Sequence, residues 1–271
     1  MLLRALTAAA LLAAFLGALL LLERPWFGAV IGVVVAIGGF EWARLSRLAQ
    51  RPALAYGAAA LLLYGVLAWA LHPLDAGHWP EAMLFAGMAA FWLVVAPLWL
   101  RRGMAQSGRA LLAAVGLIVL VPTGLAALTL SPRHLLLALG LIWIADTAAY
   151  LAGRAFGRHR LAPSISPGKT WEGVAGGAVA TLIYAIICAQ PGAPLGGYVR
   201  GAAWMPYLAA VLLLCAVSIV GDLFESALKR QAGAKDSGTL LPGHGGVLDR
   251  IDSATSTLPI AALALHWMTA T

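Results

Sequence analysis

Charge is scarce in this chain. Asp, Glu, Lys and Arg together make up 11% of its 271 residues, whereas 62% are hydrophobic and the mean hydropathy is +0.88. A soluble domain covers its core with polar and charged side chains, and this chain has too few of them. The composition therefore excludes a soluble globular domain and predicts an integral membrane protein.

Cysteine is also scarce. Cys188 and Cys215 are the only two, and both lie inside apolar segments. Two such residues provide neither a disulfide framework nor the spacing of a zinc site. The net charge of +7 is compatible with nucleic-acid binding, but the cations lie in short loops between apolar runs. They form no basic stripe interleaved with aromatic residues, so we expect no nucleic-acid partner.

Long apolar runs fill most of the sequence. A helix that crosses a bilayer needs about 20 mostly apolar residues. Nine such segments fit with short loops between them, which leaves no room for a separate soluble domain. The predicted fold is all-α, a polytopic bundle of about nine transmembrane helices. The expected spans are 6–22, 26–43, 54–71, 81–100, 110–130, 134–151, 171–189, 207–228 and 251–268.

The distribution of positive charge predicts the orientation. Cytoplasmic loops of membrane proteins are enriched in Lys and Arg. If the N-terminus is cytoplasmic, Arg4 and the loops after the second, fourth, sixth and eighth spans hold fifteen of the eighteen Lys and Arg residues. The outer loops then hold Arg24, Arg133 and Arg200. This pattern predicts a cytoplasmic N-terminus and cytoplasmic loops at 152–170 and 229–250.

Acidic residues are concentrated in one segment. Residues 221–253 contain five of the eleven Asp and Glu residues and lie between two apolar segments. Their spacing gives two groups at i, i+3, i+4 and i+7, which is one face of a helix. Two such faces could form a divalent-cation site between them, and Mg²⁺ favours oxygen ligands of this kind. The first group is Asp222, Glu225, Ser226 and Lys229, and the second is Asp249, Asp252, Ser253 and Ser256.

The same segment carries groups that bind phosphate. Glycines in the run 242–246 would let backbone N–H groups approach an anion closely. Carboxylates for a metal and cations for phosphates, together at a membrane surface, indicate phosphoryl or nucleotidyl transfer. The cations are Lys229, Arg230, Lys235 and Arg250.

Two further acids and a glycine-rich helix lie within apolar runs. Asp146 would cost roughly 2.5–3.5 kcal/mol in a bilayer, so we expect it to face a cavity or a partner. It shares a helix face with Trp143, Thr147 and Tyr150. Glu41 is expected to extend to the membrane surface and pair with a nearby arginine. The Gly and Ala residues of the span 171–189 predict close helix contact.

A second polar motif, I-S-P-G-K-T-W-E-G, occupies residues 165–173. Ser166 and Thr170 can cap the start of a helix, whose free N–H groups attract phosphate. Lys169 adds a positive charge there. Taken alone, the motif indicates an ordinary capped helix entry more readily than a phosphate site.

Together these motifs resemble one family. The runs S-A-L-K-R, K-D-S-G and L-P-G-H-G-G-V-L-D-R-I-D, between residues 226 and 252, resemble the signature of the phosphatidate cytidylyltransferase (CDP-diacylglycerol synthase) family. The runs S-P-x-K-T-x-E-G and D-T-A-A-Y-x-x-G are similar to further segments of that family. Gly168 departs from the pattern, since this position is usually Lys. The first five spans match only as apolar helices.

The resemblance implies an activity. We expect transfer of CMP from CTP to phosphatidic acid, giving CDP-diacylglycerol and pyrophosphate in phospholipid biosynthesis. The implied setting is a bacterial inner membrane, with the active site facing the cytoplasm. The implied cofactor is one or two Mg²⁺ ions, with a monovalent cation as a further possibility, and the implied assembly is a homodimer. We divide the chain into an N-terminal five-helix region, 1–130, and a C-terminal catalytic region, 131–271.

The resemblance and the chemistry of the side chains together assign roles. His244 either donates a hydrogen bond to phosphate or shapes its loop, and Glu225 is either a metal ligand or a partner of Lys229. The expected metal ligands are Asp222, Asp249, Asp252 and Asp146. The expected catalytic residues are Asp222, Asp249, Lys229 and Arg250. The expected substrate-binding residues are Ser166, Lys169, Thr170, Ser226, Arg230, Lys235, His244, Gly245 and Gly246.

Two other functions remain open at this point. A CTP-dependent polyprenol kinase would share the nucleotide and the metal but would transfer the γ-phosphoryl group to an alcohol and release CDP. A transporter would also contain intramembrane acids, although here the charges gather at one membrane face.

Overall fold

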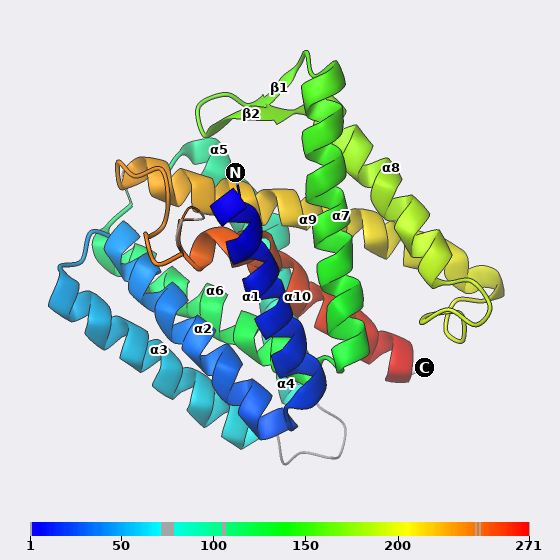
Figure 1. Ribbon diagram of the computed structural model, residues 1–271, viewed down its shortest axis with the longest axis horizontal. Helices are drawn as coiled ribbons and strands as arrows, with labels where there is room; N and C mark the ends of the chain where they lie inside the picture. Colours follow the sequence, from blue (N-terminus) through cyan, green and yellow to red (C-terminus); the bar gives the residue numbers. More distant parts are fainter. Residues whose placement is uncertain (1, 72–78, 105–106, 242, 244, 271) are drawn as a thin grey trace.

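The computed structural model describes residues 2–71, 79–104, 107–241, 243 and 245–270. Helices dominate it, and Figure 1 shows them crossing one another in a bundle with a short hairpin at one end. In chain order the elements are α1 (Leu2–Leu21), α2 (Arg24–Leu45), α3 (Gln50–Leu71), α4 (Trp79–Ala90), a π-helical turn (Phe91–Val95), α5 (Ala96–Arg102), α6 (Arg109–Thr129), α7 (Pro132–Phe156), β1 (Arg160–Ala162), β2 (Ser166–Thr170), α8 (Trp171–Cys188), a 3₁₀ turn (Gly201–Ala203), α9 (Trp204–Gln231) and α10 (Leu248–Ala270).

The predicted spans correspond to these helices. α4, the π-helical turn and α5 follow one another without a break and form the fourth span. Within the described residues, seven helices are long and apolar enough to cross a membrane. Two other long helices, α1 and α10, are not among these seven. The apolar part of α1, Leu6–Leu21, is shorter, and α10 carries charged residues in its first turns. The chain is therefore a multi-pass membrane protein with a nearly all-α fold, as predicted.

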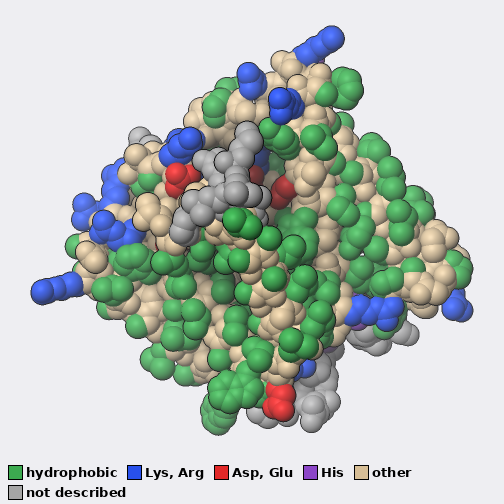
Figure 2. Space-filling model, in the orientation of Figure 1, with side chains coloured by type: hydrophobic (Ala, Val, Ile, Leu, Met, Phe, Trp, Pro, Cys, Tyr) green, Lys and Arg blue, Asp and Glu red, His purple; other side chains and the backbone are tan. Residues whose placement is uncertain are grey.

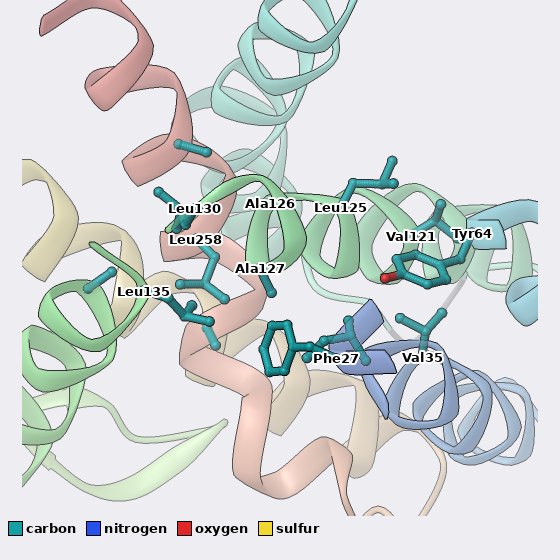
Figure 3. Packing of buried hydrophobic residues seen from close by; sticks show 14 of the residues in the cluster. Phe27, Val35, Tyr64, Val121, Leu125, Ala126, Ala127, Leu130, Leu135 and Leu258 are labelled. Atoms are coloured by element: carbon teal, nitrogen blue, oxygen red, sulfur yellow. The ribbon is translucent and has the colours of Figure 1, made fainter. Parts of the chain in front are cut away.

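Two apolar clusters hold the bundle together. The first joins α2, α3, α6 and α10, and Figure 3 shows Phe27, Tyr64, Val121 and Leu258 within it. The second surrounds Phe224 of α9, whose ring packs against four aromatic rings with centroids 5.4–6.3 Å away. Both clusters take residues from 1–130 and from 131–271, so the two regions pack against each other in each cluster. The four rings around Phe224 belong to Trp42, Phe91, Trp92 and Trp99.

Much of the segment 152–170, predicted as a loop, has regular secondary structure. α7 continues to Phe156, and β1 and β2 then form an antiparallel hairpin in which Ala162 pairs with Ser166. The prediction that Ser166 caps a helix was wrong, because Ser166 lies in β2, before α8 begins at Trp171. Thr170 is the cap, with its Oγ1 accepting a hydrogen bond from Gly173 N at 3.1 Å.

The glycines of α8 face α7, which confirms the predicted close helix contact. A Cβ atom built on Gly173 would lie 2.7 Å from the Ala149 carbonyl oxygen, and one on Gly176 would collide with Ala152 Cβ. Small residues let two helices approach closely in a membrane, where packing stabilises the pair. This glycine-rich face is therefore used within the chain and gives no support to the expected homodimer.

The polar ends of the bundle gather on one side. The N-terminus, the hairpin and the end of α9 lie in the upper and left parts of Figure 1, while the C-terminus lies at the lower right. Figure 2 shows most of the visible Lys and Arg side chains along the upper and left edges, where the hairpin and the α2–α3 connection lie. Lys and Arg are thus more frequent on one side of the bundle than on the other, and the predicted orientation depends on such an asymmetry.

Candidate active site

The hairpin and α9 meet through an ion pair. Lys169 at the end of β2 places Nζ 2.6 Å from Asp222 Oδ2 of α9, and both side chains are about one quarter exposed, 25% and 27%. The other oxygen, Oδ1, accepts a hydrogen bond from Ser226 Oγ at 3.2 Å, one helical turn further along. Three residues predicted to bind substrate or metal are thus in contact.

A second group surrounds Lys229. Its Nζ lies 2.7 Å from Glu225 Oε2, one turn earlier in α9, and 2.6 Å from Asp249 Oδ1 in the first turn of α10. The three side chains are nearly buried, with 12% of Lys229, 3% of Glu225 and 6% of Asp249 exposed. A buried charge is tolerated when it is paired, as all three are here, although Oε1 of Glu225 is buried without a hydrogen bond to another described residue. Glu225 is therefore the partner of Lys229, one of the two roles predicted for it.

Asp249 is bonded on both oxygens. Lys229 binds Oδ1. Oδ2 accepts hydrogen bonds from Ser237 N at 2.9 Å and Gly246 N at 2.8 Å, and it lies 3.0 Å from Ser237 Oγ. The carboxylate thereby fixes the segment between α9 and α10 from inside α10. Its assignment as a metal ligand stays a prediction, and a metal at Oδ1 would have to displace Lys229.

Glu41 of α2 has a role that the sequence did not suggest. Its side chain is 3% exposed and is enclosed by the protein. Oε1 accepts from Val247 N at 3.0 Å, and Oε2 accepts from Leu248 N at 2.8 Å and Ser237 Oγ at 3.0 Å. Among the described residues Glu41 forms no ion pair, so the prediction that it pairs with arginine was wrong. The reason is that α2 packs against the start of α10, where unpaired N–H groups need an acceptor.

Gly245 and Gly246, just before α10, lie against the carboxylates of Glu41 and Asp249. Gly246 donates to Asp249, and a Cβ atom on Gly245 would lie 2.6 Å from Asp249 Oδ2. Gly245 also has φ +76°, a conformation that favours glycine. The Gly246 N–H thus binds the protein's own Asp249, and contact of this segment with a substrate phosphate stays a prediction. His244 lies outside the described residues.

The remaining predicted cations lie around this group. Arg230 donates from Nε to the Ile165 carbonyl at 3.4 Å and from Nη1 to the Ala234 carbonyl at 3.3 Å, which ties the hairpin to the end of α9. Lys235 and Arg250 are exposed, and their side chains have no hydrogen bond or ion pair with another described residue. These two exposed cations are free to meet a phosphate.

Glu172 is a further residue whose role the sequence did not indicate. Its carboxylate accepts hydrogen bonds from Arg158 N at 3.1 Å and His159 N at 3.2 Å, and lies 2.6 Å from His159 Nδ1. It thereby joins the first turn of α8 to the turn that follows α7. This contact fixes the base of the hairpin that carries Lys169.

The residues present fit a magnesium ion. Asp146 is exposed on α7, on the same face as Trp143 and Tyr150, and Asp252 is half-buried on α10. No three Asp, Glu, His or Cys side chains in the described part of the chain come together as a complete metal cage. Mg²⁺ does not require one, because it is usually bound by one or two carboxylates together with substrate phosphates. Asp146, Asp222, Asp249 and Asp252 have oxygens of this kind, and both the binding of a magnesium ion and the choice of its ligands stay predictions.

Known proteins match the whole of this chain. Residues 2–268 match the model of the cytidylyltransferase family. A Pseudomonas aeruginosa protein named phosphatidate cytidylyltransferase is 40% identical over 97% of this chain and 96% of its own length. A Haemophilus influenzae protein of the same name is 36% identical over 94% of this chain and 95% of its own length. One from Brucella suis is 50% identical over 127 residues, 47% of this chain and 43% of its own.

These matches confirm and extend the resemblance found in the motifs. The motifs covered residues 146–252, whereas the family match also includes the first five spans. The aligned length, the shared motifs and the membrane fold agree with one another. The chain therefore belongs to the cytidylyltransferase family and is a nucleotidyl-transferring enzyme.

Proposed function

We propose that this protein transfers CMP from CTP to phosphatidic acid, giving CDP-diacylglycerol and pyrophosphate. The observation that carries the proposal is the 40% identity to a protein named phosphatidate cytidylyltransferase along almost the full length of both chains. The site is compatible with this chemistry, because carboxylates and exposed cations lie together at one end of the helix bundle.

The reaction makes modest demands on the protein. An oxygen of the lipid phosphate attacks the α-phosphorus of CTP, a new P–O bond forms, and the bond to the β-phosphate breaks to release pyrophosphate. The attacking oxygen is already ionised at neutral pH, so no strong general base is required. Positioning and charge stabilisation then account for most of the catalysis.

The cations are the groups suited to hold the phosphates. Lys235 and Arg250 are exposed and unpaired among the described residues, and Lys169 can turn from Asp222 to a phosphate. Lys229 is different, since two carboxylates already bind it. We therefore assign Lys235, Arg250 and Lys169 to direct phosphate contact, and Lys229 to holding Asp249 in place.

A divalent cation completes the proposed site. Mg²⁺ would neutralise the triphosphate and stabilise the charge that develops on departing pyrophosphate. Asp222 and Asp252 are the residues best placed to bind it. Asp222 is partly exposed and its partner Lys169 can turn away, and Asp252 accepts one hydrogen bond, from Ser253 N, whereas Asp249 is nearly buried and bonded on both oxygens. Asp146 would support them from α7.

We further propose that the site faces the cytoplasm of a bacterial inner membrane. Fifteen of the eighteen Lys and Arg residues lie on the side of the predicted topology that carries the site. Cytosolic CTP and a phosphatidic acid in the inner leaflet would both reach it there. A homodimer is proposed from the resemblance alone.

The experiment that tests the function uses purified protein in detergent with phosphatidic acid, radiolabelled CTP and Mg²⁺. Label should enter the lipid phase while pyrophosphate is released, and chelation of Mg²⁺ should stop both. Asp222→Asn and Arg250→Gln should each lower the rate by about 10²-fold, the effect of removing one positioned charge. Arg133→Gln, an exposed arginine at the other end of α7, is the matched control and should be as active as the wild type.

Two results would contradict the proposal. Release of CDP without cytidine in the lipid would indicate γ-phosphoryl transfer to an alcohol. No turnover of CTP by folded, lipid-bound protein would rule out the cytidylyltransferase activity and favour a transporter.

A further inference from the structure

Glu41 connects two distant parts of the chain. It accepts hydrogen bonds from Ser237 and Leu248, which are 196 and 207 residues later in the sequence. In Figure 1 the segment that leads from α9 into α10 passes beside the end of α2, where Glu41 lies. A helix of the N-terminal region thus supplies the acceptor for the start of α10.

The contact satisfies groups that would otherwise be unpaired. The first N–H groups of a helix have no partner within it, and a negative charge at that end is favourable. Glu41 binds the N–H groups of Val247 and Leu248 from outside α10, and Asp249 binds that of Gly246 from within it. A buried carboxylate is stable only when its bonds are made, so Glu41 and the start of α10 depend on each other.

Gly238 and Gly246, between α9 and α10, have no side chain where the Glu41 carboxylate lies. A Cβ atom on Gly238 would lie 2.6 Å from Glu41 Oε1, 3.0 Å from its Cδ and 3.3 Å from its Cγ. These are the three nearest contacts, and all belong to Glu41. A Cβ atom on Gly246 would collide with Ser237 Oγ and with both carboxylate oxygens of Glu41.

A chain of bonds continues from Glu41 into the candidate active site. Ser237 Oγ lies 3.0 Å from Glu41 Oε2 and 3.0 Å from Asp249 Oδ2, and Asp249 Oδ1 binds Lys229. Lys229 in turn binds Glu225. A shift of Glu41 would therefore move Asp249 and Lys229.

We propose that Glu41 is a positioning residue of this enzyme, which holds Ser237, Asp249 and the first turn of α10 in the arrangement needed for transfer, and that Gly238 and Gly246 are glycine to accommodate its carboxylate. The effect on turnover rests on the proposed function, whereas the effect on the local structure does not. The N-terminal region, on this view, completes the active site rather than only anchoring it.

The first test measures hydrogen exchange and kinetics in Glu41→Gln and Glu41→Ala. Glutamine keeps the size but loses the charge and one acceptor. We expect the amides of Val247 and Leu248 to exchange about tenfold faster in Glu41→Gln, the factor for losing one charge-assisted hydrogen bond, and faster still in Glu41→Ala. The kcat should fall about tenfold in Glu41→Gln with little change in the KM for CTP, because transition-state geometry is lost rather than ground-state binding.

The second test uses the glycine as a probe. Gly238→Ala, introduced alone, should accelerate exchange at Val247 and Leu248, because the methyl group displaces the carboxylate. In the Glu41→Ala background the same change should have no further effect, since the colliding atoms are gone. Gly87→Ala is the control, because a Cβ atom at Gly87 meets nothing within 4 Å and α4 is outside the site.

The possible outcomes separate the two proposals. If the wild type does not turn over CTP but the Glu41 variants still show faster amide exchange at the start of α10, the proposed function fails and the structural part of the inference stands. If Glu41→Gln leaves both exchange and kcat unchanged, the positioning role is wrong. It is equally wrong if Gly238→Ala has as large an effect in the Glu41→Ala background as it has alone.

Discussion

Lys169 and Asp222 join the hairpin to α9, with 2.6 Å between Nζ and Oδ2. One residue is a predicted phosphate ligand and the other a predicted metal ligand, and each neutralises the other in this structure. The pair lies at an exposed edge of the site, whereas the Glu225–Lys229–Asp249 group lies beneath it. The exposed pair is therefore available to exchange its partners for substrate, and the buried group is suited to hold the framework.

Replacement of Lys169 tests the exposed pair. In Lys169→Gln we expect CTP turnover to fall by about 10²-fold, because a charge aimed at phosphate is lost. The free energy of unfolding should change by less than about 1 kcal/mol, since a partly exposed ion pair contributes little. Turnover in detergent and SDS unfolding measure the two quantities. A loss of stability as large as the loss of activity would show that Lys169 serves the fold instead.

Replacement of Asp249 should affect activity and stability together. Asp249→Asn leaves Lys229 with one carboxylate and weakens the bonds to Ser237 and Gly246. Breaking a buried ion pair costs about 3–5 kcal/mol, so we expect a loss near the lower end of that range, with activity abolished. SDS unfolding and CTP turnover check both effects.

Asp236→Asn is the matched control, because Asp236 lies in the same segment but is exposed. Its unfolding free energy should stay within about 0.5 kcal/mol of the wild type. Inactive Asp249→Asn with unaltered stability would contradict the structural role and favour direct metal binding.

Local patterns in the sequence predicted the features that depend on local spacing. The lengths of the apolar runs predicted the helices because a bilayer sets that length. The i, i+4 spacing of Glu225 and Lys229 made a pair one of the two roles expected of Glu225, because such residues are neighbours on a helix. Thr170 was predicted as a cap because it directly precedes the helix.

Features that depend on tertiary contacts were missed. Glu41 looked like a surface acid beside arginines, because nothing near residue 41 reveals that the start of α10 packs against it. For the same reason the sequence did not show that Gly238 and Gly246 leave room for the Glu41 carboxylate. The β1–β2 hairpin is short and polar, so no alternation of apolar residues distinguished it from a loop. In the sequence, the position of Glu41 next to Trp42 at the end of an apolar run was the signal that could have suggested a distant polar partner.

The α7–α8 contact yields a stability prediction. Gly176→Val should lower the free energy of unfolding by about 1–3 kcal/mol, because its side chain would collide with Ala152 of α7. Ala175→Val is the control, since Ala175 is the preceding residue on α8 and is exposed. SDS unfolding of the two variants gives the comparison. Equal stability of both would mean that the two helices are not in close contact.

A substitution at Gly168 is expected to strengthen the binding of CTP. The motif resemblance predicts Lys at this position, one residue before Lys169, and a Cβ atom on Gly168 meets nothing within 4 Å. Gly168→Lys adds a cation at an exposed strand without a clash, and we expect the KM for CTP to fall by about two- to fivefold, as an added exposed charge is worth up to about 1 kcal/mol. The gain should shrink at high salt, because exposed charges are screened. Gly168→Gln, which adds similar bulk without charge, should leave the KM unchanged. If Gln and Lys give the same KM at low salt, the hairpin does not contact the nucleotide phosphates.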